Sequence, residues 1–245
     1  MKAIILAAGR GKRLGERGEY HPKSLLRFGG KSLLQRHIEI LRHYQIEHVT
    51  IAVGYKAEAI EAEIKAIKAQ DFVTTIHNPD YTEGSVVTLW RLGESIRCGD
   101  DFLLMDADVL YDRLMIEKLV NTNIKNCFLL DRDFEQGDEP VKLCVRENLL
   151  VEFRKKLAPD LTYDFAGESV GFFRFDRTFG ERLAQATEEY VMNQKRDQPY
   201  EEVIRDLLLE TPEQFSYEDV TGIPWIEIDF PEDILRAEKE ILPKL

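Results

Sequence analysis

The amino-acid sequence predicts an α/β fold, in which a mostly parallel sheet is covered by helices and extended by a small antiparallel annex. In the first half of the chain, short apolar runs alternate with stretches of helical periodicity, the order expected when crossover helices join parallel strands. Some of these runs are continuously apolar, as at 4–6 and 102–105, which indicates strands buried on both faces. Beyond Tyr111, short apolar runs follow one another with only polar turns between them, which favours antiparallel pairing.

Each element of the parallel part has its own signal in the sequence. Apolar side chains recur at helical spacing after Ser32 and after Gly54, and Ser32 and Ser85 are residue types that cap helices. The expected elements are a strand at 4–6, a helix from Ser32 through Leu41, a strand at 48–53, a helix bearing Ile60, Ile64 and Ile67, a strand at 72–76, a turn-rich loop at 78–84, a helix capped by Ser85, and a strand at 102–105.

The second half is predicted to carry the annex and a helical segment. The expected elements are a short helix at 114–120, strands at 127–130, 141–145, 149–153 and 168–173, helices at 177–194 and 200–209, a strand at 225–229, and a helix with Pro231 in its first turn. Gly171 interrupts the fourth of these strands, which indicates close approach of another group.

Length, charge and composition indicate the number of domains and the kinds of partner that the protein is expected to bind. No Pro/Gly/Ser-rich linker divides the 245 residues, so we expect one domain, 1–245. A balance of 33 basic and 45 acidic residues gives a net charge of −12, which disfavours binding to nucleic acid or to anionic membranes. Gly9 and Arg10 interrupt the apolar amino terminus before it reaches the length of a secretory signal, so we expect a cytoplasmic protein without membrane insertion. The oligomeric state stays open.

Cysteine and histidine give no sign of a metal or disulfide framework. Cys98, Cys127 and Cys144 are odd in number and widely spaced, which fits neither paired disulfides nor a zinc motif. The five histidines show no His-Glu-x-x-His pattern and are expected to be scattered surface or helix residues.

A phosphate-binding loop is predicted where the first strand ends. Leu6, Ala7 and Ala8 lead into a turn in which Gly9 and Gly11 let the backbone approach a ligand and direct N–H groups at it. Arg10, Lys12 and Arg13 add positive charge in a chain that is acidic as a whole. The Lys-Ser/Thr ending of a P-loop is missing, and Leu14 stands where a dinucleotide fingerprint requires its third glycine.

Two carboxylates follow the buried strand at 102–105. Asp106 and Asp108 are two residues apart at its carboxyl end and therefore initially face the same way. Carboxylates at the mouth of an apolar strand are costly unless a cation holds them, and Mg²⁺ is commonly bound by one or two carboxylates together with substrate phosphates. The sequence therefore predicts a magnesium site here, against the alternative of a solvated turn.

Motifs at the two ends of the chain resemble those of sugar-phosphate nucleotidyltransferases. The loop ends as Gly-x-Arg-Leu and is followed by Pro22 and Lys23, while the carboxyl-terminal part reads Trp-x-x-Ile-Asp-x-Pro-Glu-Asp from Trp225. The resemblance spans Met1 to about Ala237, and within this family the sequence looks most like bacterial phosphocholine cytidylyltransferases. It implies a Rossmann-like fold and an enzyme that transfers CMP from CTP to a small phosphorylated amino-alcohol or phosphonate, releasing pyrophosphate.

The resemblance also implies roles for individual residues. Lys23 and Arg13 are the expected catalytic residues, and Asp108 and Asp229 the expected ligands of Mg²⁺. The nucleotide is expected to contact residues of the loop, the start of the Ser85 helix and the strand end, namely Leu6, Ala7, Ala8, Gly9, Gly11, Lys12, Ser85 and Asp106. Ala107 stands where this family usually has glycine, and Asp106 departs from its common pattern.

The acceptor site is the least direct prediction. The family places a lysine near 155 on the acceptor phosphate, and alternation puts Lys155 and Lys156 on opposite faces without deciding between them. Aromatic and acidic residues would suit a cationic head group, and the candidates are Glu168, Asp131 and Trp225, with Tyr81, Asp133, Phe134 and Tyr217 as further ones. Two alternatives stay open: a sugar-1-phosphate nucleotidyltransferase that uses UTP, GTP or dTTP, and a non-catalytic nucleotide-binding regulatory module.

Overall fold

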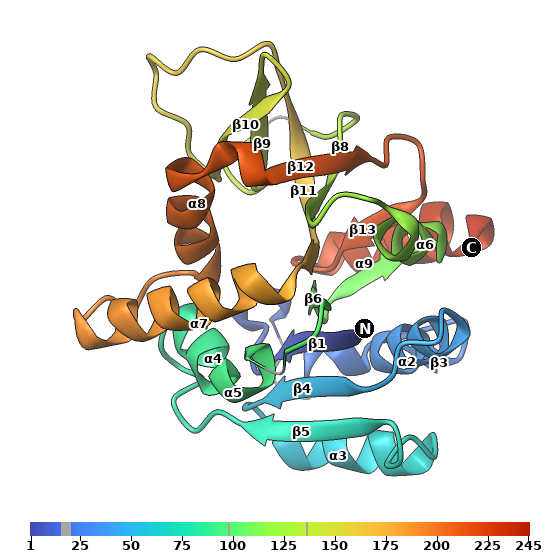
Figure 1. Ribbon diagram of the computed structural model, residues 1–245. Helices are drawn as coiled ribbons and strands as arrows, with labels where there is room; N and C mark the ends of the chain where they lie inside the picture. Colours follow the sequence, from blue (N-terminus) through green and yellow to red (C-terminus); the bar gives the residue numbers. More distant parts are fainter. Residues whose placement is uncertain (16–20, 98, 136) are drawn as a thin grey trace.

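Four parallel strands form the centre of the structure, a computed structural model (Figure 1). The structure describes residues 1–15, 21–97, 99–135 and 137–245. Strand β1 (Lys2–Ala7) lies between β4 (Val49–Val53) and β6 (Phe102–Asp106), and β5 (Val73–His77) pairs with β4. The predicted parallel sheet is confirmed, and the carboxyl ends of β1 and β6 meet at one edge, with Leu6 opposite Asp106.

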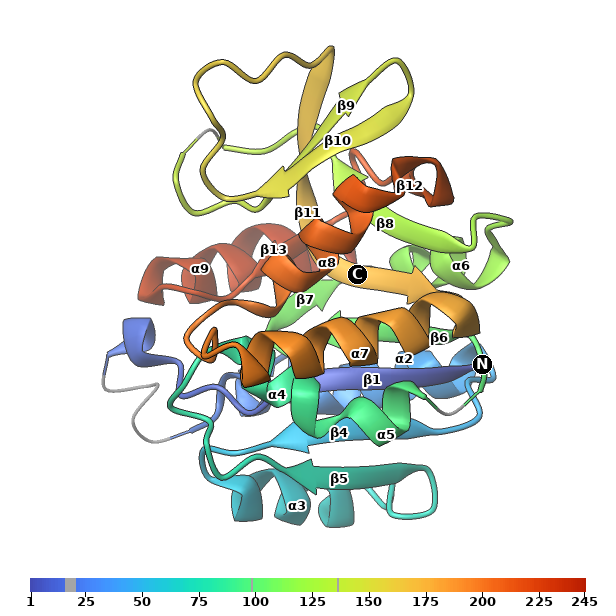
Figure 2. The same ribbon diagram turned by 60° about the vertical axis from the view of Figure 1, so that its left-hand side comes forward.

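Helices cover both faces of this sheet, as the alternation of buried side chains requires. Helices α2 (Leu33–His43), α3 (Ala57–Ala66) and α6 (Leu114–Asn121) pack on the face that Ala3 and Ile5 share. Helices α4 (Ser85–Arg91), α5 (Gly93–Ile96), α7 (Arg177–Met192) and α8 (Tyr200–Glu210) pack on the face of Ile4 (Figure 2).

Helix caps show one prediction confirmed and one wrong. Ser32 caps α2, because its hydroxyl accepts a hydrogen bond from the Gln35 N–H at 3.0 Å. The cap position of α4 is Gly84, and Ser85 is instead the first residue inside that helix. The Ser85 hydroxyl is used elsewhere: it accepts the Tyr200 N–H at 2.9 Å, at the start of α8.

The annex continues the main sheet instead of standing apart. Strand β11 (Phe165–Phe175) runs antiparallel to β6 at one end and to β9 (Lys142–Arg146) at the other, and β10 (Leu149–Arg154) pairs with β9. Strand β8 (Asn126–Asp131) also pairs with β11. Strand β12 (Phe215–Asp219) was not predicted; it lies parallel to β8 as a mostly polar strand.

Gly171 marks the bend between the two parts of β11. Its φ of +77° lies in the left-handed region, and the pairing of β11 with β8 shifts register between Ser169 and Phe173. A Cβ at this position would lie 2.3 Å from Oδ2 of Asp106. Glycine is therefore required both for the bend and for the approach of the strand to Asp106.

A two-stranded ribbon brings the carboxyl-terminal part beside the end of β6. Strand β13 (Trp225–Glu227) pairs antiparallel with β7 (Val109–Tyr111), and α9 (Pro231–Arg236) follows. The predicted strand at 225–229 is thus shorter than expected. The remaining elements are β2 (Arg27–Phe28), β3 (Lys31–Ser32), the short helices η1 (Lys12–Leu14), η2 (Lys23–Leu25), η3 (Pro212–Gln214) and η5 (Leu242–Lys244), and the π-helical η4 (Ala237–Ile241).

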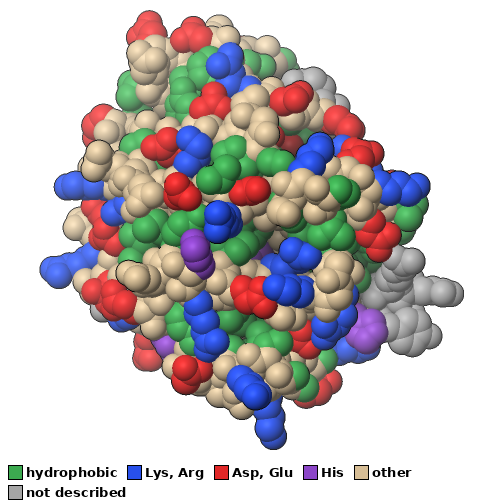
Figure 3. Space-filling model, turned by 90° about the vertical axis from the view of Figure 1, so that its right-hand side faces the viewer, with side chains coloured by type: hydrophobic (Ala, Val, Ile, Leu, Met, Phe, Trp, Pro, Cys, Tyr) green, Lys and Arg blue, Asp and Glu red, His purple; other side chains and the backbone are tan. Residues whose placement is uncertain are grey.

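Charged side chains of both signs lie on the surface (Figure 3), and two of the three cysteines belong to the described residues. Acidic and basic side chains are intermixed over the face shown in Figure 3. Among the described residues, no helix is long and apolar enough to span a membrane. Cys127 and Cys144 are buried and free, and Cys98 lies outside the described residues.

Candidate active site

A cleft of about 420 Å³ opens where β1 and β6 end. The residues named above for nucleotide, triphosphate and metal binding line it, although they come from distant parts of the chain, whereas Arg10 of the predicted loop is not among the lining residues. The predicted residues that line it are Leu6, Ala7, Ala8, Gly9, Gly11, Lys12, Arg13, Lys23, Ser85, Asp106, Asp108 and Asp229. The structure adds cleft residues that the sequence analysis did not name for the site, among them Tyr200, Glu201 and Glu227.

The glycine loop is shaped to let Lys23 lie across it. Gly11 has φ +60°, a left-handed conformation, and is followed directly by the short helix η1. A Cβ on Gly11 would approach Cγ of Lys23 to 2.9 Å. Glycine at this position therefore permits both the turn and the packing of the lysine stem against the loop.

Lys23 joins two carboxylates at the centre of the cleft. Its Nζ donates to Oδ2 of Asp108 at 2.8 Å and to Oδ1 of Asp229 at 2.5 Å. Burial alone would lower the pKa of Lys23, but these two carboxylates outweigh it and raise that pKa above its ordinary value. The same contact holds the pKa of Asp229 below its ordinary value, against the effect of burial. The lysine is therefore a fixed positive charge.

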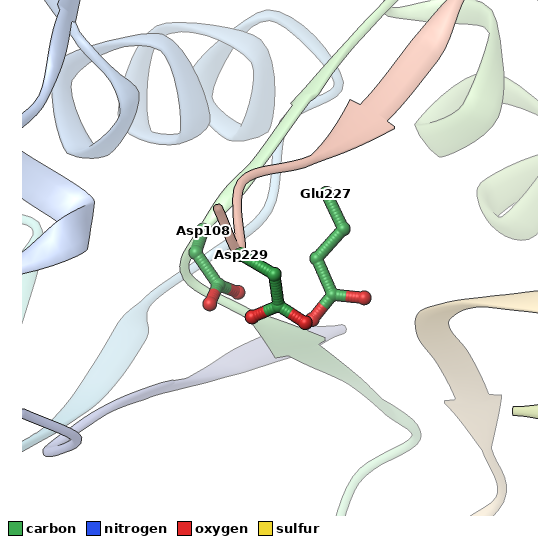
Figure 4. Close-up of side chains that lie close together, drawn as sticks. All are labelled: Asp108, Glu227 and Asp229. Carbon is green, nitrogen blue, oxygen red and sulfur yellow. The ribbon is translucent and has the colours of Figure 1, made fainter. Parts of the chain in front are cut away.

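Three carboxylates converge here, one more than predicted. Oxygens of Asp108, Glu227 and Asp229 lie within 4.8 Å of one another, and Figure 4 shows the three groups directed into one space. Glu227 as a whole is exposed, but the protein atoms around its carboxyl group desolvate it, and this effect, followed by the charges of Asp108 and Asp229, raises the pKa of Glu227 above its ordinary value. Alternation along the strand predicted at 225–229 places Glu227 on the same side as Asp229, so the signal for this residue was present in the sequence.

The composition of this cluster fits a hard divalent cation. All its donors are carboxylate oxygens, which Mg²⁺ prefers, and no histidine or cysteine takes part. The ammonium of Lys23 already bridges two of the three groups, which shows that the site stabilises a positive charge. Asp108, Asp229 and Glu227 are therefore the residues that would hold such an ion.

Asp106 does not join this cluster. Strand β6 ends at Asp106 and the chain turns before Asp108, so the two side chains do not face the same way. Oδ2 of Asp106 instead accepts a hydrogen bond from the Tyr200 hydroxyl at 2.8 Å. Burial and the nearby charge of Asp108 raise the pKa of Asp106 well above its ordinary value. Ser85 supports the same wall of the cleft through the Tyr200 N–H.

His37 lies behind the turn that carries the two aspartates. It is fully buried, with Nε2 3.1 Å from the carbonyl oxygen of Ala107 and Nδ1 3.2 Å from the Tyr111 hydroxyl. Burial lowers the pKa of His37 to about 4, so the ring is neutral near pH 7. This histidine therefore fixes the Asp-Ala-Asp turn, a role that local sequence patterns did not indicate.

Asp131, Glu168 and Trp225 form a second group, and none of the three is among the residues that line the cleft. The Trp225 Nε1–H donates to Oδ2 of Asp131 at 2.7 Å, and Glu168 is paired with Asp131 across β11 and β8. Burial, followed by the charge of Asp131, raises the pKa of Glu168 to about 7. The structure thus brings together the three residues predicted for the acceptor.

The two candidate lysines at the end of β10 differ in their surroundings. Nζ of Lys155 lies 3.5 Å from Oε2 of Glu139, which also contacts Arg13 of the glycine loop. Lys156 pairs with Asp138 at 3.8 Å, and both of these side chains are about four-fifths exposed. The structure therefore places Lys155, and not Lys156, toward the groups of the cleft.

The further acceptor candidates separate into different environments. Tyr81 lines the cleft. Asp133 is exposed and Phe134 is half-buried in the loop after β8. Tyr217 is partly buried against the hydrophobic core, and its ring packs edge-on against Phe165 with 6.2 Å between the centroids. The prediction of Tyr217 as a site residue thus lacks support from the geometry.

These features define an α/β protein with a glycine-rich anion loop and an acidic cluster in one cleft. Residues 3–162 match the MobA-like NTP transferase domain, and the chain belongs to this family. The resemblance predicted from the end motifs is confirmed.

A curated relative extends the match over most of the chain. The bifunctional IPC transferase and DIPP synthase of Aquifex aeolicus is 28% identical over 243 residues, covering 98% of this chain and 51% of that protein. The chain therefore spans about half the length of the first curated relatives it matches.

Two solved structures share the fold along nearly their whole lengths. CTP:phosphocholine cytidylyltransferase from Streptococcus pneumoniae has a TM-score of 0.74 at 21% identity, with 97% of each chain covered. The inositol-1-phosphate CTP transferase from T. maritima has a TM-score of 0.77 at 21% identity, with 99% of this chain and 95% of that one covered. The predicted Rossmann-like nucleotidyltransferase fold is confirmed.

Proposed function

We propose that this protein is a cytidylyltransferase that transfers CMP from CTP to a small phosphorylated alcohol or phosphonate. The observation that carries the proposal is the position of Lys23, which lies against the glycine loop and between Asp108 and Asp229. Such an arrangement supplies positive charge, backbone donors and a cation site in one cleft, as nucleotidyl transfer requires. CTP is favoured because both structural relatives named above use it.

The reaction needs no protein nucleophile. An oxygen of the acceptor phosphate attacks the α-phosphorus of CTP, a new P–O bond forms, and the bond to the oxygen bridging to the β-phosphorus breaks, releasing pyrophosphate. The loop amides and Arg13 hold the triphosphate, and Lys23 stabilises the charge that develops at the α-phosphate. Asp106, held by Tyr200, shapes the wall of the cleft beside them.

Magnesium is the proposed metal. Asp108 and Asp229 would hold it, with Glu227 as a third carboxylate, and when bound it would neutralise negative charge on phosphate oxygens. The protein residues orient the triphosphate and the acceptor. We place the reaction in the cytoplasm and in one domain formed by residues 1–245, as the sequence predicts.

The acceptor is proposed to carry a positive or zwitterionic head group, as in phosphocholine. Lys155 would hold its phosphate, while Glu168, Asp131 and Trp225 offer carboxylates and an aromatic face to the head group. One such desolvated contact is worth about 1.4 kcal/mol, enough for a tenfold preference.

The experiment is pyrophosphate release from each nucleotide with a panel of acceptors. We expect CTP with phosphocholine, phosphoethanolamine or an aminoalkylphosphonate to exceed any sugar 1-phosphate by at least about tenfold in kcat/KM. Inositol 1-phosphate belongs in the panel because a structural relative uses it. A preference for a sugar phosphate would move the protein to the sugar nucleotidyltransferase alternative, and nucleotide binding without turnover would indicate a regulatory module.

A further inference from the structure

Glu139 connects the two cations assigned to the two substrates. Its Oε2 accepts from Nη1 of Arg13 at 2.6 Å and lies 3.5 Å from Nζ of Lys155. Arg13 belongs to the glycine loop, whereas Lys155 follows β10 of the annex, so one carboxylate oxygen spans from one part of the fold to the other. The Arg13 contact is direct enough to hold the pKa of Glu139 below its ordinary value, against the effect of burial.

A buried lysine anchors this bridge. Lys142 is 8% exposed, and its Nζ donates to the carbonyl oxygens of Gly137 at 2.6 Å and Pro140 at 3.3 Å, on either side of Glu139 in the chain. The same Nζ donates to the carbonyl oxygen of Lys155 at 2.8 Å. One ammonium therefore positions the backbone on both sides of the Glu139–Lys155 contact.

We propose that Glu139 is an internal counter-anion, which occupies the phosphate-binding ends of Arg13 and Lys155 until substrate phosphates replace it. The inference rests on the proposed function, because that function assigns Arg13 to the triphosphate and Lys155 to the acceptor. A phosphate oxygen approaching Arg13 competes with a carboxylate for the same donor, and that carboxylate also repels it.

The size of the effect follows from exposure. The Arg13 and Glu139 side chains are 48% and 50% exposed, so their ion pair is screened by water. Removing the competing carboxylate should tighten phosphate binding about two- to fivefold, the range of a half-exposed ion pair.

The test uses Glu139→Gln and inorganic tripolyphosphate, titrated calorimetrically into the whole protein. We expect the variant to bind tripolyphosphate about two- to fivefold more tightly than the wild type. In an Arg13→Gln background the substitution of Glu139 should have a much smaller effect on tripolyphosphate affinity, because the guanidinium for which Glu139 and the phosphate compete is then absent. A role in folding alone would not produce this dependence on Arg13.

Asp138→Asn is the matched control. It removes the same charge from the neighbouring residue, whose only ion pair among the described residues is with the exposed Lys156. The proposal is overturned if Glu139→Gln binds tripolyphosphate no more tightly than the wild type, if neither protein binds it, or if Asp138→Asn gives equal tightening. Failure of the proposed function is a separate result, in which the wild type binds tripolyphosphate but releases no pyrophosphate from any nucleotide and acceptor.

Discussion

Replacing Lys23 should lower turnover and strengthen metal binding at the same time. Lys23→Met removes the ammonium and keeps a stem of similar length against Gly11, whereas Lys23→Ala removes both. One preorganised charge at the α-phosphate is worth ~3 kcal/mol in the transition state, so turnover should fall about a hundredfold or more in either variant.

The metal effect has the opposite sign because the ammonium competes for the same oxygens. In the structure Nζ contacts Asp108 at 2.8 Å and Asp229 at 2.5 Å, and an ion bound by these carboxylates must displace it. A hydrogen bond between charged groups contributes roughly 1.5–3 kcal/mol, so losing even one such competitor should tighten binding of a divalent cation at least about tenfold.

Two measurements separate these effects. Pyrophosphate release at saturating substrates reports turnover, and titration with Mn²⁺ in the absence of nucleotide, followed by electron paramagnetic resonance, reports the metal site. Lys125→Met, a loss of one exposed lysine before β8, controls for the change in net charge. Turnover within a fewfold of the wild type would refute the role of Lys23, and unchanged Mn²⁺ affinity would refute the competition.

Two further predictions concern the carboxylates. Asp108→Asn and Asp229→Asn should each abolish magnesium-dependent turnover, and the double variant should be no worse because both residues serve one ion. Asp106→Asn should lower turnover less than either. If turnover in the same assay is more sensitive to the change at Asp106, the ligand assignment is wrong. Glu168 has a pKa raised to about 7, so the folded state favours its neutral form and the free energy of unfolding should decrease as pH rises from about 4.5 to 7. Glu168→Gln should remove this loss, on the order of 2 kcal/mol, and urea unfolding at pH 5 and pH 8 would contradict the prediction if the two proteins changed in parallel.

Local sequence patterns predicted the two central strands whose ends form the site. The strand before Gly9 and the strand before Asp106 follow from apolar runs and turn residues, whereas Asp229 was assigned from the resemblance of the carboxyl-terminal motif. The structure places all three segments in one cleft. The direction of Glu227 also follows from the sequence, because alternation along the strand predicted at 225–229 places it on the side of Asp229.

The remaining site contacts depend on packing between distant segments. Tyr200 reaches Asp106 across 94 residues, and Ser85 reaches the Tyr200 backbone across 115. Ser85 has the residue type of a helix cap, and only the position of α8 determines that its hydroxyl caps that helix instead. Strand β12 was not predicted for a similar reason: its mostly polar sequence gives no strand pattern, and the segment forms a strand because it pairs with β8.

The charges of the cleft explain how an acidic protein can bind a triphosphate. Two of the cations assigned to phosphate already face carboxylates: Lys23 faces Asp108 and Asp229, and Arg13 faces Glu139 and, at 3.4 Å, Asp229. At these two cations a phosphate would therefore exchange with a carboxylate partner, which limits the attraction of unrelated anions. An ion held by Asp108 and Asp229 would release Lys23 for the phosphates, so binding of the metal and binding of the triphosphate should each strengthen the other by the same factor.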